Sequence, residues 1–194
     1  REDLDAAVYE YFGLSKQEQR LVTETVEVLA TSIRPRTFRS LDTPAQGRIQ
    51  PRQVDDYAKT LGDALGSWRD RMGGAGRFTV STLVSQANTV GAAGIVRIAS
   101  SGDETSPSRV DATVSDQLVL LTLKELRSAG LRTVSSGAAL DLVPDTHVWV
   151  GDLLYFVRPM NRRSWTNRQA LRDAERIVRM VSAPQISKEV EDVA

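Results

Sequence analysis

Arginine side chains gather near the carboxyl end of the chain, in the segment RPMNRRSWTNRQALRDAER that begins at residue 158. A guanidinium group presents its N–H donors in a planar fork that matches phosphate and carboxylate oxygens. Several such groups on one surface therefore suit an acidic partner, either the phosphates of DNA or a negatively charged protein. The candidate binding residues are Arg158, Arg162, Arg163, Trp165, Arg168, Arg172, Arg176 and Arg179.

A helix is expected to position most of these side chains. Thr166 followed by Gln169 is a capping-box pattern, and Trp165 stands where an apolar residue braces the first helical turn. After the cap, apolar residues recur every three or four positions, and the four arginines from 168 to 179 recur at the same spacing on the opposite side. The pattern predicts an amphipathic terminal helix with an arginine face.

Two interpretations of this arginine face stay open at the level of the sequence. It is either a binding surface or the solvated side of a helix, where Asp173 and Glu175 partly balance the charge. The consistent positive sign favours an acidic partner. Trp165 likewise either braces the start of the helix or stacks on the bases of single-stranded DNA.

Other residues with catalytic potential are few. The chain has one histidine, His147, and no cysteine, which excludes histidine clusters and thiolate metal sites within it. Asp141, Asp145 and Asp152 lie near the ends of strand-like runs, where a role in turns is the favoured interpretation. The alternative is a magnesium site, which would make the chain a small metal-dependent nuclease. Because no glycine-rich nucleotide loop is present either, we expect a noncatalytic chain without a cofactor.

Charge is balanced over the whole chain, with 25 basic and 25 acidic residues, but it is segregated along the sequence. Residues 1–30 carry seven acidic and three basic side chains, opposite in sign to the arginine segment. An electrostatic site must therefore come from such local concentration. Neither an apolar run of about 18 residues nor a signal-peptide pattern occurs, so we expect a cytoplasmic protein without membrane contact.

The start of the chain, residues 1–34, is predicted to be a pair of helices. Gly13 can end the first helix in the left-handed conformation, and Ser15 with Glu18 forms a capping box for the second. The apolar side of the first helix must pack against another surface, which we expect to be the third helix or another copy of the protein. These residues are Leu4, Val8, Tyr11 and Phe12. Residues 35–52 are predicted to be a linker.

The remaining chain is predicted to be an α+β domain over residues 53–183, followed by a flexible tail over residues 184–194. A helix opens at Pro51, and the runs RFTVSTLV and AAGIVRIAS are expected to form an antiparallel pair of strands. A helix from about residue 115 to residue 129 should turn Leu118, Leu121 and Leu126 inward. The later runs LRTVSS, ALDLV, THVWV and LLYFV are strand-like. This clustering of strands favours an antiparallel sheet with packed helices over alternating βαβ units.

The opening segment DLDAAVYEYFGLSKQEQRLV resembles the region that follows the catalytic domain in adenine-N6 DNA methyltransferases of restriction-modification and phage-defence systems. The residues that carry the resemblance are Leu4, Asp5, Val8, Tyr9, Gly13, Leu14, Ser15 and Glu18. The later segment YFVRPMNRRSWTNRQALRDAERIV is similar to the closing part of some of these proteins. The first match covers roughly a tenth of the chain.

The resemblance implies a module without catalytic residues of its own. The family's Asn-Pro-Pro-aromatic motif, which holds the flipped adenine, and its glycine-rich loop for S-adenosylmethionine have no counterpart in this sequence. The resemblance therefore implies that this chain is the region downstream of a catalytic domain. S-adenosylmethionine would be bound by that catalytic domain of the parent protein. The implied partners are DNA, other subunits of a defence complex, or a second copy of the chain.

Overall fold

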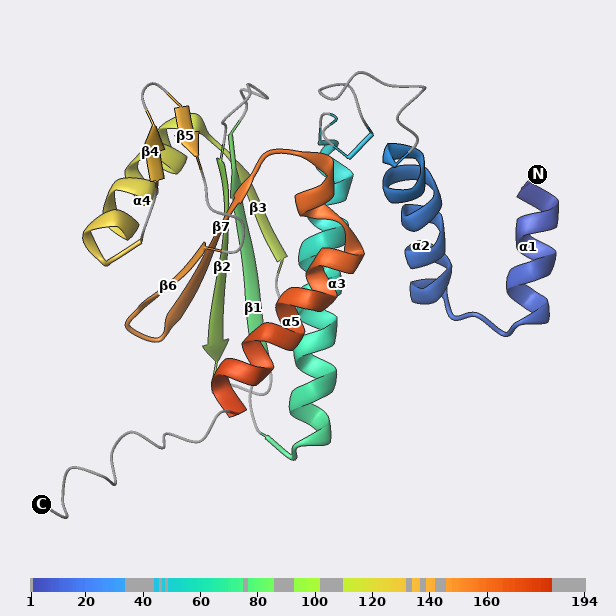
Figure 1. The fold of residues 1–194 in the computed structure, drawn as a ribbon. Coiled ribbons are helices and arrows are strands. Elements are labelled where there is room, and N and C mark those ends of the chain that lie inside the picture. The colour runs from blue at the N-terminus through green and yellow to red at the C-terminus, as the bar shows by residue number, and fades with distance from the viewer. Residues whose placement is uncertain are drawn as a thin grey trace, which may run out of the picture.

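The computed structural model describes residues 2–33, 44–45, 47, 49–74, 77–85, 93–101, 110–131, 134–136, 139–141 and 146–182. Its α-helices are α1 (Glu2–Tyr11), α2 (Lys16–Glu24), α3 (Pro51–Arg71), α4 (Asp116–Ser128) and α5 (Asn167–Ser182) (Figure 1). A π-helical turn, η1 (Thr25–Ala30), continues α2, and a 3-10 turn, η2 (Arg162–Trp165), precedes α5. The strands are β1 (Arg77–Val84), β2 (Ala93–Ser101), β3 (Val110–Val114), β4 (Val134–Ser136), β5 (Ala139–Asp141), β6 (Thr146–Val150) and β7 (Leu153–Pro159). None of the helices described has the length and apolar character needed to cross a lipid bilayer.

Five strands form one mixed sheet in the order β3-β1-β2-β7-β6, and β4 pairs with β5 in a separate two-stranded sheet. The predicted α+β class is confirmed, and β1 and β2 form the antiparallel pair expected from the sequence. The sheet differs from a purely antiparallel one at a single edge, because β3 runs parallel to β1 with Val80 opposite Val110. Because β3 has only five residues and follows a polar segment, its own sequence does not predict a strand here.

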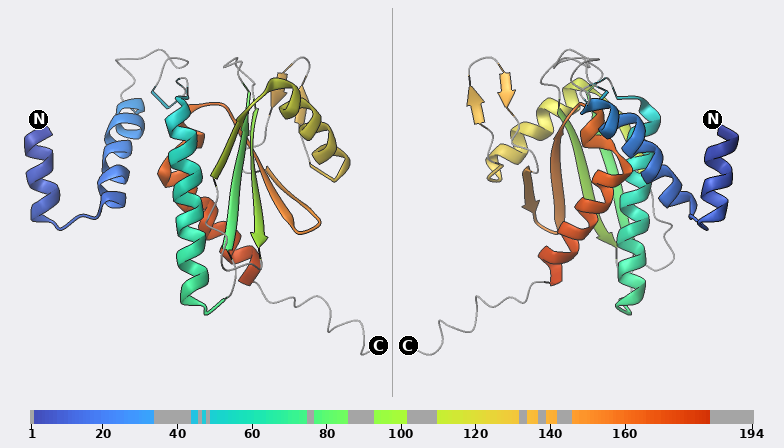
Figure 2. Two further views of the ribbon diagram at one scale, coloured as in Figure 1. Left: turned by 180° about the vertical axis from the view of Figure 1, so that it is seen from behind. Right: turned by 45° about the vertical axis from the view of Figure 1, so that its right-hand side comes forward.

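The main core lies between the sheet and the two long helices α3 and α5, which cover the same face (Figure 2). Successive side chains of a strand point to opposite faces. In β2, Val96 and Ile98 therefore meet Leu61 and Leu65 of α3, while Ile95 points to the other face. The apolar side of α3 is buried at Val54, Tyr57, Ala58, Leu61 and Leu65, and Trp68 is half-buried.

Helix α4 covers part of the opposite face of the sheet. The Ser115 hydroxyl accepts a hydrogen bond from the backbone N–H of Leu118 at 3.3 Å, which caps the helix start. Val119, Leu123 and Leu126 form its buried side. The prediction that Leu118 and Leu121 face inward is wrong, since about half of each side chain is exposed. Apolar residues occur on most sides of this helix, so their period alone does not select the buried row.

The two N-terminal helices form as predicted. Gly13 adopts a φ of 62° between them, and the backbone N–H of Ser15 donates to the Glu18 carboxylate at 2.8 Å while the Ser15 hydroxyl caps α2. Helix α2 lies between α1 and α3, so α3 does not cover the apolar side of α1 (Figures 1 and 2). Of the predicted linker only residues 44–45, 47 and 49–52 are described, and the predicted tail lies outside the described residues.

Candidate functional site

The solvent side of α5 carries one row of charged residues. Arg168, Arg172, Glu175 and Arg179 follow one another at helical spacing, and all four are exposed. Glu175 accepts a hydrogen bond from Nη2 of Arg179 at 2.6 Å. Arg176 is half-buried and flanks this row. The predicted face of four arginines is therefore a row of three arginines interrupted by one carboxylate, which we call the α5 row.

Arg162 and Arg163 precede α5 in the short turn η2. Their backbone N–H groups donate to the carbonyl oxygens of Gly47 and Ala45, at 3.1 Å and 2.9 Å. These bonds attach the turn to the segment before α3. The Arg163 side chain is exposed, whereas Arg162 is half-buried in a groove that α2 and α3 also line. Of this pair, Arg163 presents the more accessible guanidinium group.

Arg158 is part of the core, which corrects its prediction as a surface contact. Only 3% of the residue is exposed, and its Nη2 donates to the carboxylate of Asp173, which is equally buried. The same carboxylate accepts from the Tyr57 hydroxyl at 2.5 Å and from Nε2 of Gln169 at 3.2 Å. The alternation of β7 places Arg158 on the same face as Phe156, toward α3 and α5. We call these four bonded residues, Arg158, Asp173, Tyr57 and Gln169, the buried ion-pair cluster.

The protonation state of Tyr57 suits this cluster. Burial raises the pKa of its phenol well above the ordinary value, and the neighbouring Asp173 carboxylate raises it further while Arg158 opposes both. The phenol therefore stays protonated at neutral pH and donates its hydrogen bond to Asp173. The carboxylate thus meets a cation and neutral donors, which is what a buried charge requires.

Trp165 is also buried, with 1% of the residue exposed, so it is not a surface platform for stacking bases. Its indole Nε1 donates to the carbonyl oxygen of Pro159 at 3.1 Å. The ring meets Tyr57 edge to face, with centroids 5.3 Å apart. It also lies against Gly94 of β2, where a Cβ atom would overlap it. Of the two interpretations open from the sequence, the structural role of Trp165 is the one its position supports.

The amino-terminal end of α5 is satisfied by side chains. The Thr166 hydroxyl accepts from the backbone N–H of Gln169 at 3.1 Å, which is half of the predicted capping box. Glu24, at the end of α2, accepts from the backbone N–H groups of Asn167 and Arg168 at 2.8 Å and 3.3 Å. Burial raises the pKa of this carboxyl, although the backbone N–H donors counteract the shift. A carboxylate already occupies the place where a helix start would bind a phosphate.

The residues considered for catalysis are dispersed over several elements. Asp141 ends β5 of the small sheet, and Asp152 lies in the exposed turn between β6 and β7, while Asp145 lies outside the described residues. Within the described ranges, no three or more His, Asp or Glu residues are grouped as metal ligands. His147 is half-buried with its ring tilted against Phe156, at a centroid distance of 5.9 Å.

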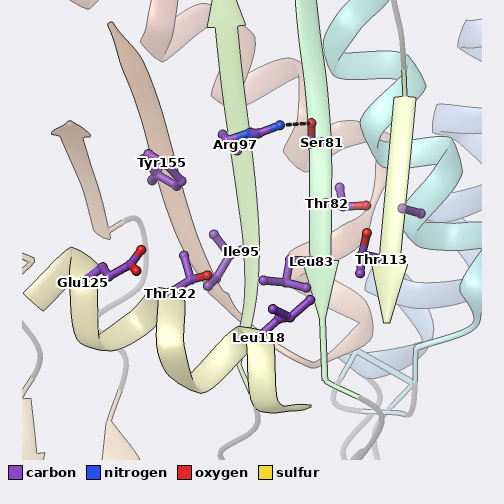
Figure 3. A pocket seen from close by; sticks show the side chains of 11 residues that line it. Ser81, Thr82, Leu83, Ile95, Arg97, Thr113, Leu118, Thr122, Glu125 and Tyr155 are labelled. Atoms are coloured by element: carbon purple, nitrogen blue, oxygen red, sulfur yellow. Dashed lines mark hydrogen bonds between the residues drawn. The ribbon is translucent and has the colours of Figure 1, made fainter. Parts of the chain in front are cut away.

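A groove of about 690 Å³ between α4 and the sheet contains polar residues that the sequence analysis did not select (Figure 3). The register aligns Ser81, Arg97 and Tyr155 across β1, β2 and β7. Nη2 of Arg97 donates to the Ser81 hydroxyl at 3.2 Å, and Glu125 of α4 lines the groove as well. The single arginine within the otherwise apolar run GIVRIA was the signal that could have identified this surface.

Comparison of this chain with protein-family models, with curated proteins and with solved structures finds no match.

Proposed function

We propose that this chain is a noncatalytic module of a DNA-modifying restriction or phage-defence protein, and that the α5 row contacts DNA phosphates. The observation that carries the proposal is the exposure of Arg168, Arg172 and Arg179 along one side of a helix whose other side is firmly packed. The resemblance of the opening segment DLDAAVYEYFGLSKQEQRLV to the region downstream of adenine-N6 methyltransferase domains supports the same assignment. S-adenosylmethionine belongs, on this proposal, to the parent protein's catalytic domain.

The structure of the row favours a contact that recognises phosphates and not base sequence. The three guanidinium groups lie on the exposed side of α5, and phosphate contacts carry little sequence information. The intervening Glu175 lowers the net charge of the row. We therefore expect weak, salt-sensitive binding with similar affinity for unrelated sequences. An acidic protein partner, such as another defence subunit, is the other occupant that this chemistry fits.

Charge reversal tests the proposal directly. Arg168→Glu combined with Arg172→Glu should weaken binding equally for unrelated DNA duplexes, and the slope of log K against log salt should flatten by about two units, since each lost phosphate contact removes about 0.9. Fluorescence anisotropy over a salt series measures both quantities. The fold should survive, because exposed substitutions of this kind change the free energy of unfolding by about 0.5 kcal/mol or less.

A matched control makes the same change of charge elsewhere. Arg97→Glu combined with Arg127→Glu alters the groove beside α4 and the end of that helix, on the other face of the sheet. This variant should keep the wild-type affinity and slope. If both variants weaken DNA binding equally, the effect is a general one of net charge. If the wild-type chain does not bind DNA even at low salt, the acidic protein partner replaces DNA in the proposal.

Catalytic assays separate the module from the alternative, a small metal-dependent nuclease that uses Asp141, Asp145 and Asp152. The purified chain is expected neither to methylate DNA with S-adenosylmethionine nor to cleave it with Mg²⁺ or Mn²⁺, because a lone histidine and dispersed carboxylates do not form a catalytic constellation. Metal-dependent cleavage that disappears in an Asp152→Asn or Asp141→Asn variant would replace the module with the nuclease.

A further inference from the structure

Helix α1 exposes its apolar side to solvent. Leu4, Val8, Tyr11 and Phe12 share one side of the helix, and 84% of Tyr11 and 67% of Phe12 are exposed. The helix touches α2 through its other side, where the Tyr9 hydroxyl lies 3.3 Å from the Thr23 hydroxyl. An exposed apolar patch of this kind is typical of an interaction surface.

The same chain also has an apolar groove that nothing in the described residues fills. It has a volume of about 670 Å³ and lies where α3 and α5 end, beside the turn between β6 and β7. This is the lower end of the molecule in Figure 1. The residues that give the groove its apolar character are Trp68, Met72, Phe78, Trp149, Ile177 and Val181. Concave, mostly aromatic and aliphatic surfaces of this size are typical of binding sites.

One cation is fixed in the wall of the groove. The guanidinium carbon of Arg69 lies 4.7 Å from the centroid of the Phe78 ring, and Nη2 donates to the Ser100 hydroxyl at 3.0 Å. Helix α1 is suited to meet a cation, because its ten residues EDLDAAVYEY contain four acidic side chains and no basic one. Asp5 lies seven residues before Phe12, so it borders the apolar side of α1. The carboxylate of Asp152 also lines the groove, in an exposed turn where water and salt screen it.

We propose that two copies of this chain associate by placing α1 of each copy in the apolar groove of the other. This is helix-in-groove recognition, with Leu4, Val8 and Tyr11 as anchors at spacings of four and seven residues. A helix of ten residues is about 15 Å long, enough to present all of these anchors to one groove. Exchange in both directions gives a closed two-fold dimer, which doubles the buried apolar surface and leaves neither patch exposed.

Helix α4 offers another exposed apolar surface, formed by Leu118, Leu120 and Leu121. The apolar groove suits α1 better than this α4 surface does, for two reasons. Leu120 lies on the outer, convex side of α4, whereas the groove is concave. Leu118 borders the groove between α4 and the sheet, where Arg97, Thr122 and Glu125 make much of the lining polar. The apolar groove is lined mostly by aromatic and aliphatic side chains, which match the apolar side of α1.

Cysteine crosslinking can test this arrangement without background, because the chain contains no cysteine. Val8→Cys and Met72→Cys, prepared separately and mixed, should give a covalent heterodimer with a short thiol-reactive crosslinker. Val8→Cys mixed with Leu121→Cys is the matched control, since Leu121 is an exposed apolar residue of similar accessibility on α4. Crosslinking only with Leu121→Cys, or only between two Val8→Cys chains, would overturn the groove as the site that binds α1.

Sedimentation of the full chain supplies the second measurement. The wild type should show a concentration-dependent dimer, and Tyr11→Asp combined with Phe12→Asp should sediment as a monomer. Met72→Asp combined with Trp149→Asp, in the groove, should have the same effect. Circular dichroism should be unchanged in both variants, because all four side chains are largely or half exposed. A wild-type chain that stays monomeric at the highest concentration would rule out the association.

Discussion

Replacing Asp173 by alanine is expected to lower the free energy of unfolding by about 3–5 kcal/mol, since it leaves a buried guanidinium group without its counter-charge. Arg158 lies in the core with 3% of its surface exposed, where water cannot replace the lost carboxylate. The Tyr57 hydroxyl loses its acceptor in the same variant. Urea denaturation followed by circular dichroism gives the free energy.

Two comparison variants isolate the effect of burial. Glu175→Ala removes the carboxylate of the exposed pair with Arg179 and should cost no more than about 1 kcal/mol, because solvent screens that pair. Arg158→Met combined with Asp173→Leu should be more stable than Asp173→Ala alone, since apolar residues of similar volume often replace a buried ion pair without loss. Equal costs for Asp173→Ala and Glu175→Ala would contradict the buried position of the cluster.

The buried ion-pair cluster also explains why the α5 row is a stable surface. Its bonds join α5 to β7 and α3, while Glu24 joins the start of α5 to α2. The exposed arginines therefore stand on a helix that is fixed from two sides. Variants of the buried ion-pair cluster should change the stability of the protein, whereas variants of the α5 row should change DNA binding. Stability measurements therefore test the fold, and binding measurements test the proposed function.

Local signals in the sequence predicted the elements well where the interactions that form them are local. The predicted capping box of Ser15 with Glu18 joins residues three positions apart, and α2 begins where it indicates. Helix α4 begins at Asp116, next to the expected start at about residue 115. The pair β1–β2 follows from two adjacent β-rich runs. The parallel strand β3 does not, because its place beside β1 depends on a partner far along the chain.

The candidate site shows the same division. Helical spacing predicted that four arginines would face solvent. Arg168, Arg172 and Arg179 do, whereas Arg176 is half-buried. In the alternative of a solvated helix, Asp173 is a surface charge that partly balances the arginines, but the structure turns it inward to Arg158. The alternation of β7 places Arg158 on the face of Phe156, but apolar residues lie on both faces of this strand, so the local pattern does not show that Arg158 is buried. Its burial depends on a carboxylate from another element, α5. The contact of Glu24 with α5, from more than 140 residues away, is beyond sequence patterns for the same reason.

Trp165→Ala is expected to lower the free energy of unfolding by about 3–5 kcal/mol, the usual cost of removing a large buried aromatic side chain. The indole is enclosed by Tyr57 and by the backbone at Gly94, and its N–H is satisfied by Pro159, so the substitution leaves a cavity in the main core. Because the ring is not accessible, binding to single-stranded DNA should not be lost selectively when the variant is compared under conditions in which it is folded.

Gly94→Ala turns this prediction into a double-mutant cycle. In the wild type, the added methyl group would overlap the Trp165 ring and lie 2.9 Å from Sδ of Met160, so we expect a cost of about 1–3 kcal/mol from overpacking. In the Trp165→Ala background the cavity can accept the methyl group, and the same change should cost almost nothing. The two substitutions should therefore be non-additive by about 1–3 kcal/mol, as expected for residues in contact.

Gly66→Ala is the matched control, since a Cβ at this position within α3 meets nothing within 4 Å. It should stabilise the protein by about 0.5–1 kcal/mol, because alanine favours a helix interior over glycine. Its effect should also be the same with and without Trp165. Additive effects of Gly94→Ala and Trp165→Ala would show that the indole does not lie against β2, and the account of α5 as a helix anchored through Trp165 would then fail.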